Sequence, residues 1–423
     1  MLNARIVAVN VLTEISEAAS YSNIAADAAI NAAQLQKNEA RLATAIIYGC
    51  LQRKITLDRI IEALNDKRPK KLDAFVLSAL EIGVYQILFL DRIPDSSAVN
   101  ESVNIIKKSR FKHSSGFVNA ILRKASSNKH DLLRQIDESR DISFKYSCPV
   151  PLLKSLIADY GRETAEEYLA ASLNAPETFA RVNTLKISSD ELYSLLEEKG
   201  IECTPWALEG CFSLKNAGSV EKLDEFKNGL FYIQDPASQL CIKALDIKIG
   251  MSVLDICSAP GGKSFTAAMY LKSSGRIVSC DLYEKRVGLI SSGAERLGIS
   301  NLTALVADAS AVNSSFPLFD RVICDVPCSG FGVLRRKPEI KYKTESFGEL
   351  EELQLKILQN ASSYLKKDGK LLYSTCTLRK SENEGIVNKF LKSNPDFSIE
   401  CSRTLMPNTD GTDGFFYCVL KRK

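Results

Sequence analysis

The sequence has few histidines, no Cys-x-x-Cys motif and no long hydrophobic run. Its two histidines, His113 and His130, lie in the first third of the chain, so we expect no Ser-His-Asp triad and no zinc site in the later part. No segment reaches the roughly 18 apolar residues of a membrane-spanning helix, and residues 1–17 lack the apolar core of a signal peptide. The twelve cysteines are scattered. We therefore expect free thiols, a cytoplasmic protein, no bound metal and no membrane association.

The composition is that of an ordinary globular protein, with 45% hydrophobic and 25% charged residues. A length of 423 residues predicts two or three domains. The net charge of +4 is unevenly spread, because residues 1–140 hold 20 Lys and Arg against 15 Asp and Glu. Basic clusters occur at 67–71, 107–112 and 123–124. Each alone is typical of a solvated helix face, whereas three together favour a surface that follows nucleic-acid phosphates.

Residues 1–140 carry apolar residues at helical spacing, which predicts an all-helical domain. The predicted helices include Ala4–Ile15, Glu39–Leu51, Leu72–Leu90 and Ser96–Lys108. A polar stretch at 126–140 then leads to Cys148-Pro149-Val150-Pro151, which marks a boundary. Residues 141–245 mix elements and predict a small α+β domain, with helices at 152–160, 163–172 and 189–199 and a strand at 178–182.

In residues 246–423 predicted strands and helices alternate, which indicates an α/β fold with a parallel sheet covered on both faces. The predicted strands are 252–256, 276–280, 303–306, 320–324 and 369–373. The predicted helices are 264–271, 284–297 and 349–365. A last pair of strands, 397–400 and 415–420, is expected at the edge.

Acidic residues end four of these strands. The first, Asp255, precedes a loop of small residues that lets the backbone approach a ligand at a helix N-terminus: Cys257, Ser258, Ala259, Pro260, Gly261, Gly262 and Lys263. Asp281 ends the second strand, where such folds bind ribose hydroxyls. Asp308 follows the third strand, where a carboxylate suits an exocyclic amine, and Asp325 ends the fourth.

The four carboxylates predict the cofactor. They would repel the pyrophosphate of a dinucleotide, and no G-x-G-x-x-G fingerprint is present. They suit a ligand with a cationic amino-acid end and a sulfonium, so the sequence predicts S-adenosylmethionine. The alternative is that Asp255 and Asp281 only cap helices.

Two cysteines follow predicted strands: Cys328 in DVPCSGFG and Cys376 in YSTCT. C5 of cytosine is a poor nucleophile, but thiolate attack at C6 turns C5 into an enamine carbon that accepts a methyl group. One sulfur must attack and another group must later remove the C5 proton, so two thiols fit this chemistry. The turn Asp-Val-Pro-Cys replaces the Asp-Pro-Pro-Tyr of amino-group methyltransferases, which favours a carbon acceptor.

The segments DICSAPGGK, DVPCSGFGVLRRKPEIKY and YSTCT resemble the Nol1/Nop2/Sun family of RNA cytosine-5 methyltransferases. YSNIAADAAI, RLATAIIYGCLQRK and GFVNAILRK resemble the NusB-like helical RNA-binding domain of its bacterial Sun-type members, which methylate a cytosine in 16S ribosomal RNA. The resemblance covers essentially the whole chain. It implies a NusB-like domain over 1–140, a small α+β domain over 141–245 and a Rossmann-like methyltransferase domain over 246–423.

The resemblance implies catalytic roles for three residues. Cys376 matches the nucleophile that attacks C6, Cys328 the cysteine that helps release the product, and Asp325 an acid near the base and the methyl donor. From the residues alone the nucleophile stays open, because DNA cytosine-5 methyltransferases attack with a Pro-Cys thiol and Pro327-Cys328 has that form. A reactive thiol needs nearby positive charge or amide dipoles, and Lys263 and Arg335-Arg336 are candidates to supply the charge.

The resemblance also implies donor-binding positions at 257–263, Asp281, Asp308 and Asp325. Asn383 and Glu384 match a family helix that supports this region. Val326, Phe331 and Thr377 depart mildly from the common pattern, and we expect them to adjust only the shape of the pocket.

The sequence also contains two basic features, Arg181 and the stretch Val333–Pro338, whose roles it does not decide. Arg181 could contact phosphate or pair with an interior acid. The basic stretch Val333–Pro338 directly follows the Cys328 loop, and we hypothesise that its Arg336 contacts the RNA backbone.

The sequence thus predicts a monomeric, S-adenosylmethionine-dependent enzyme that methylates C5 of a cytosine in 16S ribosomal RNA. The RNA is expected to be free or partly assembled, because the target base must leave its stack. The same chemistry on tRNA or large-subunit ribosomal RNA is the alternative. A non-catalytic RNA-binding assembly factor is the rival from another class, and the two cysteines with the four acids argue against it.

Overall fold

The computed structural model describes residues 3–18, 22–65, 72–342 and 347–423. It divides into a helical unit, Met1–Ala175 with Leu334–Thr344, and a sheet unit, Pro176–Val333 with Glu345–Lys423. Among the described helices, none combines the length and the apolarity that crossing a membrane requires. The basic cluster at 67–71 lies outside the described residues.

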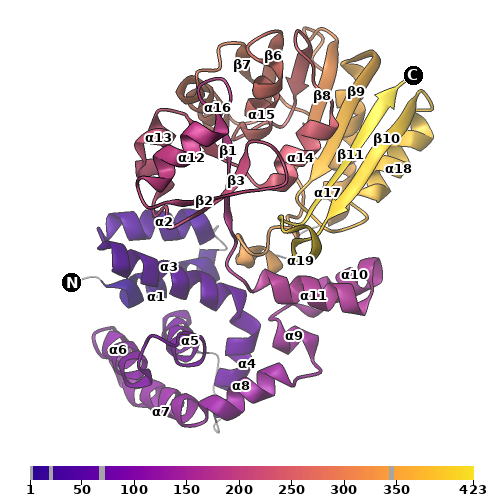
Figure 1. Ribbon diagram of the computed structural model, residues 1–423. Helices are drawn as coiled ribbons and strands as arrows, with labels where there is room; N and C mark the ends of the chain where they lie inside the picture. Colours follow the sequence, from indigo (N-terminus) through magenta and orange to yellow (C-terminus); the bar gives the residue numbers. More distant parts are fainter. Residues whose placement is uncertain (1–2, 19–21, 66–71, 343–346) are drawn as a thin grey trace. The chain divides into compact units, whose positions relative to one another are not determined.

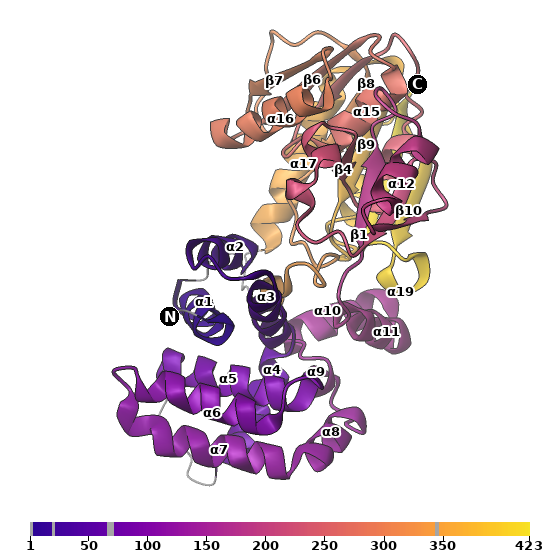
Figure 2. The same ribbon diagram turned by 60° about the vertical axis from the view of Figure 1, so that its left-hand side comes forward.

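In the helical unit, the helices from α1 to α8 contribute buried side chains to one apolar core, and Figure 1 and Figure 2 show how these helices are arranged. The prediction of a helical first region is confirmed, since α1, α3, α5 and α6 overlap the four predicted helices. Its helices are α1 (Ala4–Ala18), α2 (Ser22–Ala32), α3 (Lys37–Gln52), α4 (Lys54–Leu64), α5 (Ala74–Phe89), α6 (Asp95–Lys107), the 3-10 helix η1 (Lys112–Ser114), α7 (Ser115–Ser127), α8 (Lys129–Asp137), α9 (Ile142–Lys145), α10 (Val150–Tyr160) and α11 (Arg162–Ser172).

Helix α5 shows how the sequence fixes a central helix. The Asp73 side chain accepts a hydrogen bond from the Phe75 backbone N–H at 3.0 Å, which caps the first turn. Most of the helix is buried, including Glu81, which is 4% exposed and pairs with Lys54 at 2.6 Å. A charge in this position is tolerated because it has a charged partner.

The polar stretch 126–140, interpreted from the sequence as the segment that leads to the domain boundary, is itself largely helical. Helix α7 continues to Ser127 and α8 follows from Lys129. Leu132 and Ile136 lie four residues apart on one side of α8 and pack into the core. Two apolar residues are too weak a periodic signal to predict a helix from sequence.

The segment Leu334–Thr344 belongs to the helical unit, although the chain before and after it belongs to the sheet unit. Its 3-10 helix η3 (Pro338–Tyr342) packs on α3. Lys341 Nζ donates to the carbonyl of Gln52 at 2.7 Å, and the Tyr342 hydroxyl donates to the carbonyl of Leu51 at 2.9 Å. These bonds satisfy carbonyls at the end of α3 that have no partner within the helix.

A four-stranded antiparallel sheet of order β2-β3-β1-β4 begins the sheet unit. Its strands β1, β2 and β3 are labelled in Figure 1, and β4 is labelled in Figure 2. Ser188 and Glu191 exchange hydrogen bonds in a capping box that starts α12. The prediction of a small α+β region is confirmed. Its elements are β1 (Thr178–Val182), α12 (Ser189–Glu197), β2 (Glu202–Pro205), β3 (Cys211–Lys215), η2 (Val220–Lys222), α13 (Asp224–Lys227) and β4 (Phe231–Ile233).

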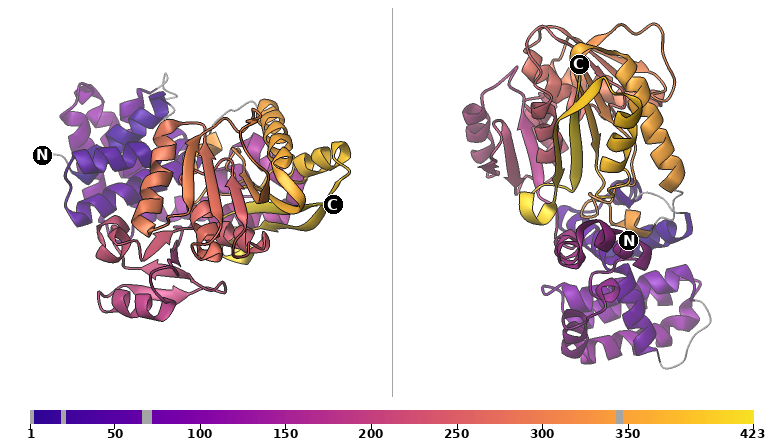
Figure 3. Two further views of the ribbon diagram at one scale, coloured as in Figure 1. Left: turned by 90° about the horizontal axis from the view of Figure 1, so that it is seen from above. Right: turned by 90° about the vertical axis from the view of Figure 1, so that its right-hand side faces the viewer.

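The second sheet has seven strands in the order β10-β11-β9-β8-β5-β6-β7, and Figure 3 shows the molecule from two further sides. The strands are β5 (Ser252–Asp255), β6 (Arg276–Asp281), β7 (Leu302–Val306), β8 (Phe319–Asp325), β9 (Leu365–Thr375), β10 (Phe397–Leu405) and β11 (Phe415–Arg422). The five strands β5 to β9 are parallel, and β10 and β11 add antiparallel pairs at one side. The predicted Rossmann-like α/β fold is confirmed.

Helices cover both faces of this sheet, because its strands are apolar on both sides. In β8, Ile323 joins a core with α14, α15 and α16, whereas Val322 and Cys324 join a core with α17 and α18. The helices are α14 (Pro236–Ala244), α15 (Gly262–Leu271), α16 (Glu284–Leu297), α17 (Phe347–Ser363), α18 (Glu384–Ser393) and α19 (Pro407–Asp410). This packing leaves the carboxyl ends of the parallel strands for a ligand.

Candidate active site

The loop 257–263 joins β5 to α15 and has the conformation expected of a ligand cradle. Gly261 has φ +109°, and a Cβ atom there would lie 2.4 Å from the Phe265 ring, so only glycine fits. The Ser258 backbone N–H and hydroxyl both donate to the carbonyl of Cys280, at 2.8 and 3.1 Å. The loop is thereby held against the end of β6, beside Asp281.

Asp255, the last residue of β5, lies beneath this loop. It is fully buried and accepts a hydrogen bond from the Ser264 hydroxyl at 2.7 Å. Burial raises the pKa of Asp255 to about 7. Its contact is with the first turn of α15, which agrees with the alternative that this acid supports the helix.

Asp281 ends β6, and Asp308 follows the end of β7 by two residues. Asp281 accepts the Ala259 and Tyr283 backbone N–H groups, each at 3.3 Å, and pairs with Arg286 at 3.3 Å. Asp308 is exposed, and hydrogen bonds from the hydroxyl and backbone N–H of Ser310 hold its pKa below the usual value. Both carboxylates therefore lie at the same edge of the sheet as the glycine loop.

The donor set fits the predicted cofactor. The glycine loop at the start of α15 lets the protein backbone approach a ligand closely. The carboxylates at successive strand ends can accept hydrogen bonds from ribose hydroxyls or an amine. Residues 257–263, Asp281 and Asp308 would hold S-adenosylmethionine in this arrangement.

Asp325 connects the cradle to the two cysteines. Its Oδ2 lies 2.7 Å from Lys263 Nζ, and its Oδ1 accepts the Ser374 hydroxyl at 2.7 Å. Burial lowers the pKa of Lys263, but the Asp325 carboxylate outweighs that effect and the pKa is raised. Lys263 therefore keeps its positive charge at neutral pH.

The sulfur atoms of Cys328 and Cys376 lie 3.4 Å apart. Cys376 directly follows β9, and Cys328 comes three residues after β8 ends at Asp325. Strands β8 and β9 are parallel neighbours in which Asp325 is paired with Ser374, so the loops that leave them meet. All twelve cysteines lie in the described part of the chain and none forms a disulfide.

The surroundings of Cys328 favour its protonated form. A hydrogen bond to Cys376 raises the pKa of the Cys328 thiol well above its usual value, and burial and the charges of Glu382 and Asp325 add to the effect. Either sulfur can be the donor in this contact, and these surroundings make Cys328 the sulfur that we expect to keep its proton. Cys257, by contrast, has its pKa raised by burial first of all, as expected of a thiol that is not reactive.

Three side chains that the sequence analysis did not single out complete the site. Ser374 binds Asp325, while Gln354 and Glu382 are fully buried beside the Cys328 loop. Ser374 stands two residues before Cys376, so its position was a usable signal. Gln354 on α17 is 22 residues from the nearest cysteine in sequence, Cys376, and no local pattern points to it.

Other predicted residues lie elsewhere. Arg181 is 4% exposed, so it does not lie on an exposed surface. Its Nη1 donates to the Gln239 side chain at 3.2 Å, and this partner is an amide rather than an acid. Arg335 and Arg336 belong to the helical unit. Their predicted effect on the thiols and the predicted contact of Arg336 with RNA stay predictions.

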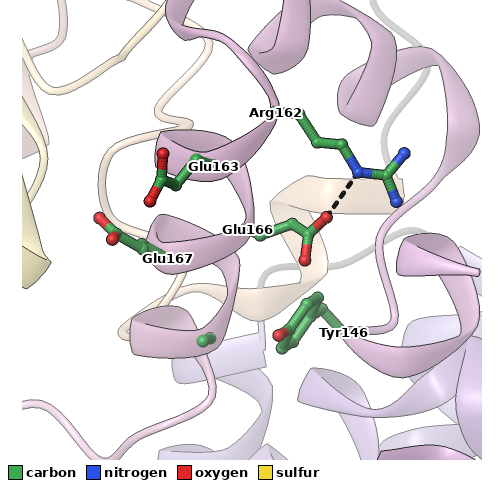
Figure 4. A pocket seen from close by; sticks show the side chains of 6 residues that line it. Tyr146, Arg162, Glu163, Glu166 and Glu167 are labelled. Atoms are coloured by element: carbon green, nitrogen blue, oxygen red, sulfur yellow. Dashed lines mark hydrogen bonds and ion pairs between the residues drawn. The ribbon is translucent and has the colours of Figure 1, made fainter. Parts of the chain in front are cut away.

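A surface hollow of about 500 Å³ occurs in the helical unit, lined by Tyr146, Arg162, Glu163, Glu166, Glu167 and Ala170 (Figure 4). Arg162 pairs with Glu166 at 2.9 Å, and the other glutamates leave the lining acidic. None of the predicted site residues lines it, and acidic walls do not suit a nucleic-acid backbone.

Comparisons with known proteins agree with this geometry. The family described as 16S rRNA methyltransferase RsmB/F matches residues 242–421, the NusB family matches 2–127, and the RsmF/B-like ferredoxin-like domain matches 148–221.

Full-length relatives are also similar. The probable ribosomal RNA small subunit methyltransferase B of Bacillus subtilis is 34% identical over 100% of this chain and 99% of the relative. The ribosomal RNA small subunit methyltransferase B of Vibrio cholerae is 32% identical, over 92% and 91%. The crystal structure of PH0851 shares the fold, with a TM-score of 0.83 at 24% identity over 100% and 99% of the two chains. A methyltransferase homolog from Pyrococcus horikoshii has a TM-score of 0.60 at 28% identity, over 67% and 98%.

Proposed function

The chain belongs to the RsmB/F family of 16S rRNA methyltransferases, and on this premise we propose that it methylates C5 of a cytosine in 16S ribosomal RNA. S-adenosylmethionine is its cofactor, and when bound it supplies an electrophilic methyl group on a sulfonium sulfur. The observation that carries the proposal is the pair of sulfur atoms 3.4 Å apart beside Asp325. Two thiols at the carboxyl ends of neighbouring strands suit covalent catalysis at a pyrimidine ring.

We assign the first step to Cys376. Its thiolate forms a bond to C6, and the electron pair of the C5–C6 double bond then makes C5 the nucleophile that takes the methyl group. The Cys328 S–H supports the thiolate by donating to it. The Pro-Cys alternative would require Cys328 to be the thiolate, and its raised pKa argues against that order.

We assign release of the product to Cys328. Once the Cys376 sulfur is bonded to C6, it no longer carries the charge that kept Cys328 protonated, so Cys328 can lose its own proton to solvent. Cys328 then accepts the proton from C5, and the electron pair expels the Cys376 thiolate and restores the C5–C6 double bond. Lys263 and Ser374 both bind the Asp325 carboxylate and fix its position. We assign Asp325 to a contact with the edge of the target base.

Two variants test these roles. Cys328→Ser should accumulate a protein–RNA adduct that survives a denaturing gel, because attack remains and release is blocked. Cys376→Ala should form no adduct and should lose methylation by more than about 10³-fold. Full methylation by Cys376→Ala would contradict the covalent mechanism, and an adduct in that variant would mean that the two roles are exchanged.

The RNA target needs its own test. We propose a monomer that acts in the cytoplasm on free or partly assembled small-subunit RNA. Bisulfite sequencing of RNA from a deletion strain should lose one 5-methylcytosine signal in 16S ribosomal RNA. A signal lost from tRNA or large-subunit ribosomal RNA instead would support the alternative substrates, and no lost signal would support the assembly factor.

The helical unit supplies a basic surface for this RNA. We define the α6–α7 basic face as the exposed residues Lys107, Lys108, Arg110, Lys112 and Arg123. Lysines that contact phosphates release counterions, so Lys108→Ala should lower the slope of log Kd against log salt by about one. Lys154→Ala removes an exposed lysine from α10 and is the matched control. Equal slopes for the two variants would argue that this face does not follow the RNA.

A further inference from the structure

We propose that the adjacent residues Glu382 and Asn383 are positioning residues that each hold one cysteine loop and so fix the two sulfurs at their working separation. The inference rests on the proposed function, since it concerns the same two thiols. Both side chains are fully buried between the end of β9 and the start of α18. Glu382 contacts Ser329 and Gln354 at the Cys328 loop, and Asn383 contacts Thr375 and Thr377 at the Cys376 loop.

Glu382 holds the Cys328 loop. Its Oε2 accepts the Ser329 backbone N–H at 2.9 Å, and its Oε1 accepts the Ser329 hydroxyl at 2.5 Å. Gln354 Nε2 donates both to Glu382 Oε2 and to the carbonyl of Pro327, each at 2.9 Å. The residues before and after Cys328 are therefore fixed by one small network. Arg379 Nη1, at 3.1 Å from Oε1, balances the carboxylate charge.

Asn383 holds the Cys376 loop in the same way. Its Oδ1 accepts the Thr375 hydroxyl at 2.6 Å, and its Nδ2 donates to the carbonyl of Thr377 at 3.0 Å. These are the residues directly before and after Cys376. One amide side chain thus uses its acceptor on one side of the cysteine and its donor on the other.

The two loops are also joined to each other. The hydroxyls of Ser329 and Thr377, each the residue after a cysteine, lie 2.7 Å apart. The Gly332 backbone N–H donates to the carbonyl of Cys376 at 2.9 Å. Because Glu382 and Asn383 are neighbours in the chain, a shift of either loop must be transmitted to the other through this network.

The chemistry gives the separation a purpose. The Cys328 S–H can support the Cys376 thiolate only within hydrogen-bond reach, and a hydrogen bond weakens steeply when its geometry is poor. A misplacement of 1 Å in an active site can lower the rate by about 100-fold. We therefore expect Glu382→Gln and Asn383→Ala to lower kcat by about 10- to 100-fold with KM for S-adenosylmethionine unchanged within about twofold.

Glu382→Gln tests the proposed role of Glu382, because it changes the hydrogen bonds of the side chain but keeps its size. It replaces an acceptor oxygen with a donor amide opposite the N–H donors of Ser329 and Gln354. Glu351→Gln is the matched control, since Glu351 also contacts Arg379, at 3.5 Å, from α17. Asn394→Ala is the control for Asn383→Ala, because Asn394 closes the other end of α18.

The decisive readout needs neither RNA nor methyl transfer. Diamide oxidises two adjacent thiols to a disulfide and is itself reduced to the hydrazine, and the Cys328–Cys376 bond is then found by peptide mass spectrometry. We expect the wild type and both controls to form it at the same rate, and Glu382→Gln and Asn383→Ala at least about tenfold more slowly. Wild-type rates of oxidation and of methylation in both variants would overturn the proposal.

Two further results keep the outcomes distinct. If Glu382→Gln does not fold, Ser329→Ala removes the 2.5 Å contact and the link to Thr377 and is measured in the same way. Wild-type oxidation and methylation rates in Ser329→Ala would then overturn the proposal. If Cys376→Ala keeps full methylation, the proposed covalent mechanism fails, while slow disulfide formation in the variants still shows that the two residues position the sulfurs.

Discussion

Cys328 and Cys376 share one hydrogen bond, and only one of the two sulfurs can donate the proton in it. Either sulfur can be the donor at 3.4 Å, and we assign the proton to Cys328 because burial and the charges of Glu382 and Asp325 also raise its pKa. The positive charge of Lys263 is balanced by Asp325 at 2.7 Å, so its field at the thiols is reduced. The neighbouring thiol therefore contributes to the thiolate that we assign to Cys376, besides any charge from Lys263.

Cys328→Ala tests this contribution. The variant removes the S–H donor, so less Cys376 is thiolate at a given pH, and the midpoint of its alkylation by iodoacetamide should move to higher pH by about one pH unit, which is the effect of one hydrogen bond of about 1.4 kcal/mol. Cys328→Ser keeps a donor and should shift the midpoint less. A midpoint that is equal in the wild type and both variants would contradict the donor role.

The sequence could predict the residues whose chemistry is distinctive, such as Cys376, Asp325 and Lys263. It could not predict Glu382 or Gln354, because an acid or amide that binds a backbone N–H looks the same in sequence as a solvated one. Their significance comes from burial and from partners between 27 and 53 residues away in the chain. The roles of the site residues stay predictions until the variants above are measured.

At the level of the elements, strand existence was easier to predict than strand order. The five predicted parallel strands overlap β5 to β9, because buried parallel strands are short apolar runs between helices. That β8 and β9 are neighbours, and that β11 lies on the other side of β9, follows from pairing over long distances in the chain. This order, which no local pattern encodes, brings the two cysteine loops together.

Asn183 joins the small sheet to the large one. It follows β1 and is fully buried, and its Nδ2 donates to the carbonyl of Gly229 at 2.7 Å and to that of Leu297, the last residue of α16, at 2.8 Å. Its Oδ1 accepts the Leu185 N–H at 3.1 Å. One side chain thus satisfies three backbone groups from three segments.

Asn183→Ala should therefore lower the free energy of unfolding of the sheet unit by about 2–3 kcal/mol, because buried carbonyls lose their partners. Urea unfolding followed by fluorescence measures it, and S-adenosylmethionine binding at low temperature should be retained. Asn301→Ala is a control, since the Asn301 side chain donates a hydrogen bond of 3.3 Å to the carbonyl of Ser274. A loss no larger than in the control would contradict the joining role.

At the level of the whole molecule, the chain changes unit between Val333 and Leu334. The preceding loop belongs to the sheet unit, with Gly332 bonded to the carbonyl of Cys376, and the next residues belong to the helical unit. The sequence predicted three consecutive domains with boundaries near 140 and 245, and that division stays a proposal. A basic stretch next to a catalytic motif gives no local sign that it packs in another unit.

Lys341 makes this segment sensitive to pH. It is 4% exposed, and burial lowers its pKa to about 8, against about 10.5 in the unfolded chain. Below pH 8 Lys341 is charged in both the folded and the unfolded chain, and the folded chain bears the full desolvation cost of the buried ammonium. Between pH 8 and 10.5 the unfolded state holds more protons than the folded state, so stability rises with pH across that window by up to roughly 3 kcal/mol.

Lys341→Met removes this dependence while it keeps the length of the side chain. The variant leaves the carbonyl of Gln52 without its 2.7 Å partner, which costs about 1 kcal/mol, so at pH 7 it should exceed the wild type in stability by roughly 1–2 kcal/mol. By pH 10.5 the order should be reversed, because the wild-type lysine is then neutral in the folded state. Urea unfolding of both proteins at pH 7, 8, 9, 10 and 10.5 measures the difference, in which all other titrating groups cancel. Lys337→Met, an exposed neighbour, should differ from the wild type by the same amount at every pH. If Lys341→Met behaves in that way too, Lys341 is not buried in the helical unit in solution.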